Sequence, residues 1–197
     1  MRVLRIGILL PALLALAACG INSVPRAEET AQARWADVEA AYQRRADLIP
    51  NLEATVRGFA DQESEVLTQV TEARSQATRV NLDAGDLTDP AAMEQFAEAQ
   101  GELSGALSRL LVTFEAYPEL RSSELFLNFQ SQLEGTENRI NIAIRDYNEA
   151  VRDYNTRLRT FPEAIGGTLR GSEEMELYEA VSEDAEIAPE VDFSQDG

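Results

Sequence analysis

Residues 132–155 read QLEGTENRINIAIRDYNEAVRDYN, and this stretch decides the fold that the rest of the chain must adopt. From Ile140 onward, apolar and aromatic residues recur at alternating steps of four and three, the period of a helix that packs nearly parallel to other long helices. We predict one helix over 122–160, about 55–60 Å long. Pro162 ends it, because a proline disfavours the helical conformation of the preceding residue. The predicted inward-facing residues are Phe126, Leu133, Ile140, Ile144, Tyr147, Val151, Tyr154 and Leu158.

Residues 26–80 carry the same apolar period. The period keeps its phase from Trp35 to Val80, although the region contains Pro50. A proline inside a helix removes one hydrogen bond and clashes with the carbonyl four residues earlier, at a cost of about 3 kcal/mol. The unbroken phase favours one helix kinked at Pro50, whereas the tight run before Pro50 and Asn51 after it favour two helices.

A further helix is predicted over 90–117. It begins at Asp89-Pro90, which is typical of an N-cap followed by proline in the first turn, and Pro118 ends it. Either Ser122 or Ser123 caps the helix that follows. Because no β-strand pattern of any length occurs, the sequence predicts an all-α protein of long helices, either three with the first kinked or four.

The composition excludes much catalytic chemistry. The chain has 197 residues, contains neither Lys nor His, and has one cysteine, Cys19. It therefore has no Ser-His or Cys-His pair, no imidazole metal ligand and no Schiff-base lysine, and we expect no cofactor. A site made only of carboxylates stays open. The net charge of −18 argues against binding nucleic acid and against lying flat on an anionic membrane.

Residues 1–18 have the pattern of a signal peptide. Arg2 and Arg5 form a basic region, and the apolar segment 6–18 that follows is too short to span a bilayer.

The sequence Leu-Ala-Ala-Cys at 16–19 resembles the lipobox of bacterial lipoproteins. The resemblance implies cleavage between Ala18 and Cys19 and acylation of Cys19, so that residues 19–25 become a lipidated tether. A secretory signal with an incidental cysteine and an uncleaved anchor are the alternatives. Gly20 after the cysteine favours the outer membrane over the inner one.

Each predicted helix has a row of inward-facing, mostly apolar positions, which we call its seam. Four polar residues occupy seam positions: Arg45, Glu63, Gln100 and Glu137. Because a buried charge needs a partner, we hypothesise that some of them pair across the bundle and set its register. The alternative is that long side chains at the seam edges reach water.

A Tyr-Asn pair occurs twice at a spacing of seven, as Tyr147-Asn148 and Tyr154-Asn155. The spacing places both pairs on one face of a helix. The tyrosine rings are expected to pack in the core with their hydroxyls at its edge, and a ligand site is the alternative interpretation.

Residues 163–197 are predicted to form a glycine hinge, at 165–168, and an acidic C-terminal tail. Residues 172–197 hold ten acidic residues and no basic one, interspersed with apolar side chains. Such mixing is typical of a solvated tail, and the alternative is a docking segment that folds back on the bundle or binds a partner.

Taken together, several stretches resemble the LemA family over roughly residues 32–193. The matching stretches are Tyr42–Leu52, Val56–Ala60, Glu63, Ala73-Arg74, Ala116–Leu120, Gln132–Ile140, Arg145–Asn148, Val151, Tyr154-Asn155, Phe161-Pro162 and Pro189–Phe193. The candidate structural and motif residues are Tyr42, Arg45, Asp47, Pro50, Asn51, Glu63, Glu137, Arg139, Tyr147, Asn148, Tyr154 and Asn155.

The resemblance implies an antiparallel up-and-down four-helix bundle, over 26–162, attached to a membrane by its N-terminus. It favours a break at Pro50 and makes the acidic tail part of the family pattern. Family members commonly carry a longer apolar anchor helix, and here the lipobox stands in its place. Some members look associated with membrane metalloproteases and envelope stress, but no active residue carries over to this chain.

We therefore expect a non-enzymatic lipoprotein adaptor or scaffold, anchored by Cys19 and facing the periplasm. Its expected partners are the membrane and an envelope protein, with a membrane protease as one candidate, and no nucleic acid. A small-ligand or divalent-cation sensor and a carboxylate-based hydrolase are the alternatives. The oligomeric state stays open.

Overall fold

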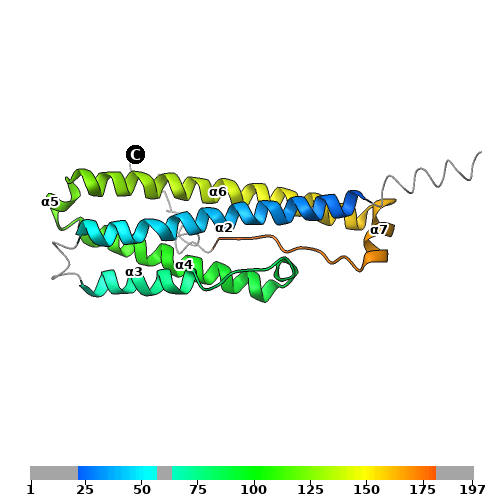
Figure 1. The fold of residues 1–197 in the computed structure, drawn as a ribbon, viewed down its shortest axis with the longest axis horizontal. Helices are drawn as coiled ribbons and strands as arrows, with labels where there is room; N and C mark the ends of the chain where they lie inside the picture. The colour runs from blue at the N-terminus through cyan, green and yellow to red at the C-terminus, as the bar shows by residue number, and fades with distance from the viewer. Residues whose placement is uncertain (1–21, 57–63, 181–197) are drawn as a thin grey trace, which may run out of the picture.

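The computed structural model describes residues 22–56 and 64–180, which are mostly helical (Figure 1). The all-α class is confirmed for these residues, since no strand occurs in either range. Residues 172–180 follow the last helix and its Gly171 cap as an extended segment. The helices are α2 (Ser23–Val56), α3 (Ser64–Ala77), α4 (Pro90–Phe114), α5 (Pro118–Arg121), α6 (Glu124–Arg159) and α7 (Glu163–Arg170), with a 3-10 turn, η1 (Asp86–Thr88), before α4.

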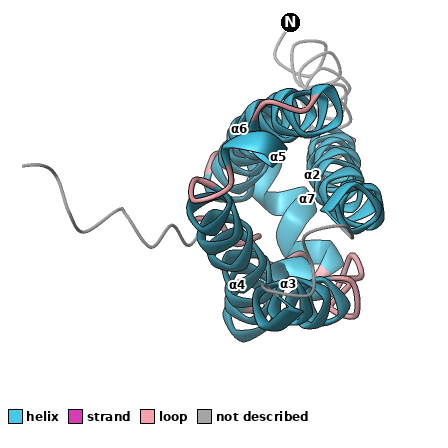
Figure 2. Cartoon of the chain, turned by 90° about the vertical axis from the view of Figure 1, so that its left-hand side faces the viewer, coloured by secondary structure: helices cyan, strands magenta, loops and turns pink. Residues whose placement is uncertain are grey.

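The long helices α2, α3, α4 and α6 lie side by side along the molecule. α2 packs along α6, and α3 packs along α4 (Figures 1 and 2). The short α5 joins α4 to α6 at one end, and α7 lies at the other end, against α2 and α6. The extended segment returns from α7 toward the middle of the molecule (Figure 1).

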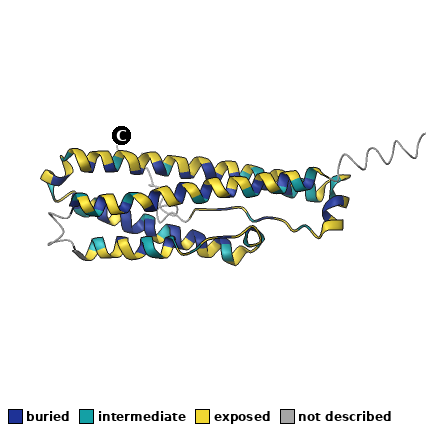
Figure 3. Cartoon of the chain, viewed as in Figure 1, coloured by how far each residue is buried: buried dark blue, intermediate teal, exposed yellow. Residues whose placement is uncertain are grey.

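The inward faces of the helices are buried and the outward faces are exposed (Figure 3). Around the ring of Trp35, the rings of Tyr147, Phe96 and Tyr178 have their centroids 5.0, 5.2 and 5.6 Å away in edge-on contacts. Such pairs contribute about 0.5–1.5 kcal/mol beyond their buried area. Because Tyr178 belongs to the extended segment, that segment completes the hydrophobic core.

The predicted helix over 122–160 is confirmed as α6. Ser123 caps it, because its side-chain hydroxyl accepts a hydrogen bond from the backbone N–H of Phe126 at 3.3 Å. All the predicted inward-facing residues are buried except Leu158, which is partly buried. The predicted start of α4 is also confirmed, since the Asp89 side chain accepts from the N–H of Ala91 at 2.9 Å.

The predicted break at Pro50 is wrong, because α2 continues through Pro50 to Val56. The proline removes the N–H that would bond the carbonyl of Ala46, and the side chain of Arg74 on α3 supplies a replacement. Its Nε donates to the Ala46 carbonyl oxygen at 2.7 Å. The chain passes from α2 to α3 between Val56 and Ser64, and residues 57–63 lie outside the described residues.

Two other predicted boundaries are shifted. α2 begins at Ser23 and not near Arg26, so residues 23–25 of the predicted tether are helical and Val24 is buried. Pro25 fits there because the N–H groups of a first helical turn need no intrahelical acceptor.

The predicted glycine hinge at 165–168 is helical and forms part of α7. Gly167 allows close packing on α6, because a Cβ on it would come within 2.6 Å of a side-chain methyl carbon of Leu158. The helix ends at Gly171, which has a φ of 67°, and the N–H of Ser172 bonds the carbonyl of Gly167 at 3.1 Å. This is a Schellman cap, for which glycine is the preferred residue.

We predict that the contribution of Arg74 to stability depends on Pro50. Replacing Arg74→Met keeps the aliphatic stem but removes the donor, and should lower the free energy of unfolding by about 1–3 kcal/mol. In a Pro50→Ala background, the restored backbone N–H at position 50 bonds the Ala46 carbonyl, so the same change should cost about 1 kcal/mol less. Urea unfolding of the four proteins measures this coupling, and equal losses in both backgrounds would contradict it.

Candidate functional site

Two tyrosines of α6 hold the backbone of the extended segment. The Tyr154 hydroxyl donates to the carbonyl oxygen of Glu173 at 2.8 Å, and the Tyr147 hydroxyl donates to that of Glu176 at 2.9 Å. Both acceptors are backbone atoms, so the contacts do not depend on which side chains the segment carries.

Two asparagines of α6 bond the same segment through both the NH₂ group and the oxygen of their side-chain amides. Asn155 donates to the carbonyl of Met175 at 2.8 Å and accepts from its N–H at 3.0 Å. Asn148 bonds both backbone groups of Tyr178 in the same way, at 2.9 Å each. We call these four side chains, Tyr147, Asn148, Tyr154 and Asn155, the tail clamp.

The spacing of the tail clamp follows from the geometry of a helix beside an extended chain. Seven helical residues advance about 10.5 Å and return to nearly the same face. Three extended residues advance about 10 Å. The second Tyr-Asn pair therefore meets the segment three residues from the first, which explains why the repeat has a period of seven.

Further contacts attach the segment to the rest of the molecule. The Tyr178 hydroxyl lies 2.8 Å from the Tyr42 hydroxyl, and the N–H of Glu176 bonds the carbonyl of Leu87, before α4, at 2.8 Å. Arg159 forms an ion pair with Glu174, which lowers the pKa of that carboxyl. Residues 172–180 thus dock on the bundle, as the docking alternative anticipated, and residues 181–197 lie outside the described residues.

Burial dominates the electrostatics of these tyrosines. It raises the pKa of Tyr147 and Tyr178 far above the usual value of 10, and it raises the pKa of Tyr42 and Tyr154 in the same direction. Each hydroxyl therefore stays protonated and remains a hydrogen-bond donor well beyond neutral pH.

A buried arginine lies at the centre of the bundle. Arg45 on α2 is 1% exposed, and its guanidinium donates to the Ser104 hydroxyl at 2.6 Å and to the Glu137 carboxylate at 3.2 Å. It also donates to the backbone and side-chain oxygens of Gln100, at 3.0 and 2.9 Å. Gln100 in turn donates to the carbonyl of Ala77, at the end of α3, at 3.1 Å. The network therefore joins α2, α3, α4 and α6.

The structure brings together three of the four polar seam residues, Arg45, Gln100 and Glu137. Glu137 is 43% exposed, so one of its oxygens is held by Arg45 while the carboxylate still reaches solvent. The Tyr42 ring completes the surroundings, with the guanidinium carbon 4.9 Å from its centroid. Glu63 lies outside the described residues.

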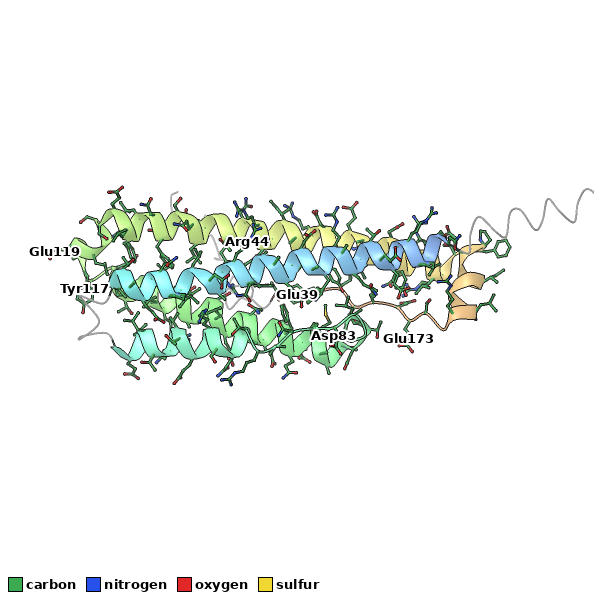
Figure 4. The ribbon with its side chains drawn as sticks, in the orientation of Figure 1. Glu39, Arg44, Asp83, Tyr117, Glu119 and Glu173 are labelled. Atoms are coloured by element: carbon green, nitrogen blue, oxygen red, sulfur yellow. The ribbon has the colours of Figure 1, made fainter. Side chains whose placement is uncertain are left out.

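Other motif residues lie on a different face. Asp47, Asn51 and Arg139 line a shallow hollow of about 530 Å³ between α2 and α6, together with Arg44, which is labelled in Figure 4. Asp47 accepts a hydrogen bond from Gln43 at 2.8 Å. Ala18 and Cys19 lie outside the described residues.

A cleft of about 590 Å³ opens between α4 and α6 at the point where the docked segment ends. Leu107 and Leu111 of α4 and Leu133 of α6 form its apolar wall, and Tyr178 and Ala180 lie at its end.

The polar groups of this cleft continue the tail clamp. Asn141 lines the cleft and lies seven residues before Asn148, so it occupies the next position of the asparagine series on α6. Glu134 and Glu137 are the acidic residues that line the cleft, and Arg45 is buried beneath it.

The sequence analysis assigned no contact to four residues of these sites, Arg74, Ser104, Asn141 and Tyr178, although Arg74 belongs to a stretch that resembles the family and Tyr178 to the acidic tail. Asn141 could have been found, because it extends the asparagine spacing of seven by one step. The other three act on groups at least 28 residues away in the chain, and no local pattern marks them.

Neither a metal centre nor a membrane-spanning helix is present in the part of the chain that the structure describes. Within residues 22–56 and 64–180, no three acidic or cysteine side chains are grouped so that they could hold a metal ion. None of the described helices combines the length and the apolar character needed to cross a bilayer.

The fold and site define an all-helical protein that binds an extended segment of its own chain through backbone hydrogen bonds. Residues 34–193 match the LemA family, and the chain belongs to this family. It is similar to Protein LemA of Metamycoplasma hominis, with 26% identity over 140 residues, which cover 71% of this chain and 60% of the relative. The chain thus matches about three fifths of that relative's length. Family membership indicates a membrane-associated protein and assigns no molecular activity by itself.

We predict that reversing the charge of Glu137 destabilises the fold. Glu137→Lys places an ammonium beside the buried Arg45 guanidinium and should lower the free energy of unfolding by about 2 kcal/mol or more, since breaking a fully buried pair costs about 3–5 kcal/mol and solvent reaches Glu137. Glu134→Lys is the matched control, because Glu134 is exposed on the same helix, and its effect should stay within about 0.5 kcal/mol. Thermal and urea unfolding measure both, and an unchanged Glu137→Lys protein would refute the pairing.

We predict that stability falls in alkali because of the clamp tyrosines. A tyrosine whose pKa is raised by folding keeps its proton while the unfolded chain loses its own near pH 10, so stability is level from pH 7 to about 9.5 and falls above that. The slope should reach about 1.4 kcal/mol per pH unit for each such tyrosine. Tyr147→Phe should make this slope smaller by about 1.4 kcal/mol per pH unit. Urea unfolding of both proteins across the pH range measures the slopes, and identical slopes would contradict the prediction.

Proposed function

We propose that this protein is a non-enzymatic, lipid-anchored adaptor of the bacterial cell envelope, with an antiparallel four-helix bundle as its framework. Cys19 would carry the lipid and become the first residue after cleavage behind Ala18, and the bundle would face the periplasm. The adaptor would bind an extended segment of another envelope protein in the cleft between α4 and α6.

The observation that carries the proposal is that the asparagines of the tail clamp belong to a series with a spacing of seven, and that the next member of the series lines the cleft between α4 and α6. Asn148 and Asn155 each bond both backbone groups of one residue of an extended chain. Asn141 offers an amide of the same kind at the next position of the series, where it lines the cleft. The chain therefore supports backbone recognition of an extended peptide, which gives affinity with little dependence on sequence.

The lining of the cleft specifies the chemistry of the partner. Leu107, Leu111 and Leu133 favour an apolar side chain, and Glu134 and Glu137 favour a basic residue beside it. Arg45 adds little attraction for acidic groups, because it is buried and already bonded to Glu137 and Gln100. A partner segment with an apolar residue next to an arginine or lysine fits this combination.

The cleft supports binding better than hydrolysis. Hydrolysis by carboxylates alone needs two acids that converge on one bond, one of them free to give or take a proton. Here one oxygen of Glu137 accepts a hydrogen bond from Arg45, and Glu134 lies on the same helix surface and not across the cleft from it.

We predict that a photocrosslinking residue in the cleft captures a defined envelope protein. Ser108 lines the cleft and is exposed, whereas Glu102 is exposed on α4 outside the cleft and serves as the control. A crosslinker at position 108 should yield one discrete product in native membranes, and the product should weaken when Asn141→Ala is added. The control position should not yield it.

The same experiment includes a shortened chain that ends at Ala180. This end point keeps the tail clamp intact, whereas removal of residues 172–197 would strip Met175 and Tyr178 from the core. Retention of the product in the shortened chain supports the cleft as the partner site. Crosslinking of position 108 only to residues 181–197 of the same chain, or equal products at both positions, would overturn the proposal.

A further inference from the structure

The geometry of the α7 end points to a second interaction surface. We propose that Phe161, Ile165 and Leu169 contact the membrane and seat the bundle upright on it. This inference rests on the lipid anchor of the proposed function and goes beyond it, because it assigns a lipid-binding face to the folded domain itself. The occupant is a lipid bilayer, with the three side chains at the level of the headgroups.

These side chains are exposed to an unusual degree. Phe161 is 83% exposed and Leu169 is 79% exposed, the two highest values among the large apolar side chains that the structure describes, and Ile165 is 52% exposed. Ile165 and Leu169 are four residues apart in α7 and therefore lie on one face of it. The opposite face of α7, which includes Gly166 and Gly167, is buried against the bundle. Clustered apolar exposure of this kind marks an interaction site.

The exposed face lies at the end of the molecule where the N-terminal segment joins the bundle. α7 packs against α2 and α6 at that end, and α2 begins there (Figure 1). Glu173, just after α7, lies toward this end in Figure 4, and Tyr117 and Glu119 mark the opposite end. A tether attached to the start of α2 therefore leads to the α7 end and not to the α5 end.

The length of the tether limits how far this end can lie from the membrane. α2 begins at Ser23, and four residue steps separate Ser23 from Cys19. Even a fully extended chain spans at most about 3.6 Å per residue, or about 14 Å over these steps. An acylated Cys19 therefore holds the α7 end within about 14 Å of the bilayer surface, or roughly twice the thickness of one headgroup layer.

The charge distribution favours the same orientation. The chain has a net charge of −18, which disfavours contact of its acidic sides with an anionic bilayer. Residues 157–170 instead hold three arginines and one glutamate. Arg157 and Arg159 pair with acids beside them, and Arg170 follows Leu169 at the exposed end of α7. This end is therefore close to neutral, and apolar contact there meets little repulsion.

The test is a fluorescence measurement on the full-length, lipidated chain in vesicles of phosphatidylethanolamine and phosphatidylglycerol. An NBD label is attached to Leu169→Cys in one protein and to Leu125→Cys in a second, matched protein. Leu125 is also apolar and 66% exposed, but it lies at the start of α6 beside α5. Acylation consumes the thiol of Cys19, so the label reports only the introduced cysteine.

We expect the label at position 169 to shift its emission to shorter wavelength and to be quenched by doxyl-labelled lipids, and the label at position 125 to emit as in water. In the Leu169→Cys protein, adding Phe161→Ser and Ile165→Ser should reduce the shift. These residues are exposed, so the substitutions leave the core intact. Equal, water-like emission at both positions in a protein with confirmed acylation would overturn the inference and leave the anchor standing.

Intact-mass measurement separates failure of this inference from failure of the anchor. If Cys19 carries no lipid, the anchor is refuted, and the inference is then decided by the position 169 label in a protein that also carries Cys19→Ser, so that no second thiol is labelled. A blue shift on adding vesicles would show that the α7 face binds lipid without an anchor. No shift would overturn both proposals.

Discussion

The structure depends on one buried charge, the guanidinium of Arg45. A cation held away from water costs several kcal/mol unless its donors are paired, and here two of its nitrogens bond Ser104, Glu137 and both oxygens of Gln100. These partners come from α4 and α6, and Gln100 extends the network to the end of α3. A shift of any long helix by one turn, about 5.4 Å, would break these bonds. The network therefore fixes the register of the helices relative to one another, which apolar side chains alone would not specify.

A second constraint acts on the backbone, because buried carbonyl and N–H groups must find partners. Pro50 frees the carbonyl of Ala46, and Arg74 bonds it. Among the described residues no strand lies beside the extended segment, so the side chains of the tail clamp supply most of these partners and the Leu87 carbonyl supplies one. Helix α6 thereby acts as one edge of a groove for an extended chain, and Tyr178 and Ala180 of that chain line the cleft between α4 and α6.

These features give the molecule two distinct regions along its length. The α7 end carries exposed apolar side chains where the N-terminal segment joins the bundle, and the cleft lies further along, between α4 and α6. The proposed adaptor role needs this separation, because a surface in contact with lipid would not also hold a protein partner. The long helices set the distance between the two, and the Arg45 network keeps that distance constant.

The sequence by itself determined the helical class, the inward faces of the helices, the cap at Asp89 and a cap at Ser122 or Ser123, because periodicity and capping act over a few neighbouring residues. It also identified Arg45, Gln100 and Glu137 as polar residues on apolar seams. Only the tertiary structure decided that α2 passes through Pro50, that Gly167 lies in a packed helix, and that the Tyr-Asn repeat binds residues 173–178. Each of these depends on a partner brought close by folding, and the sequence carries no local mark of which distant group will satisfy a freed hydrogen bond.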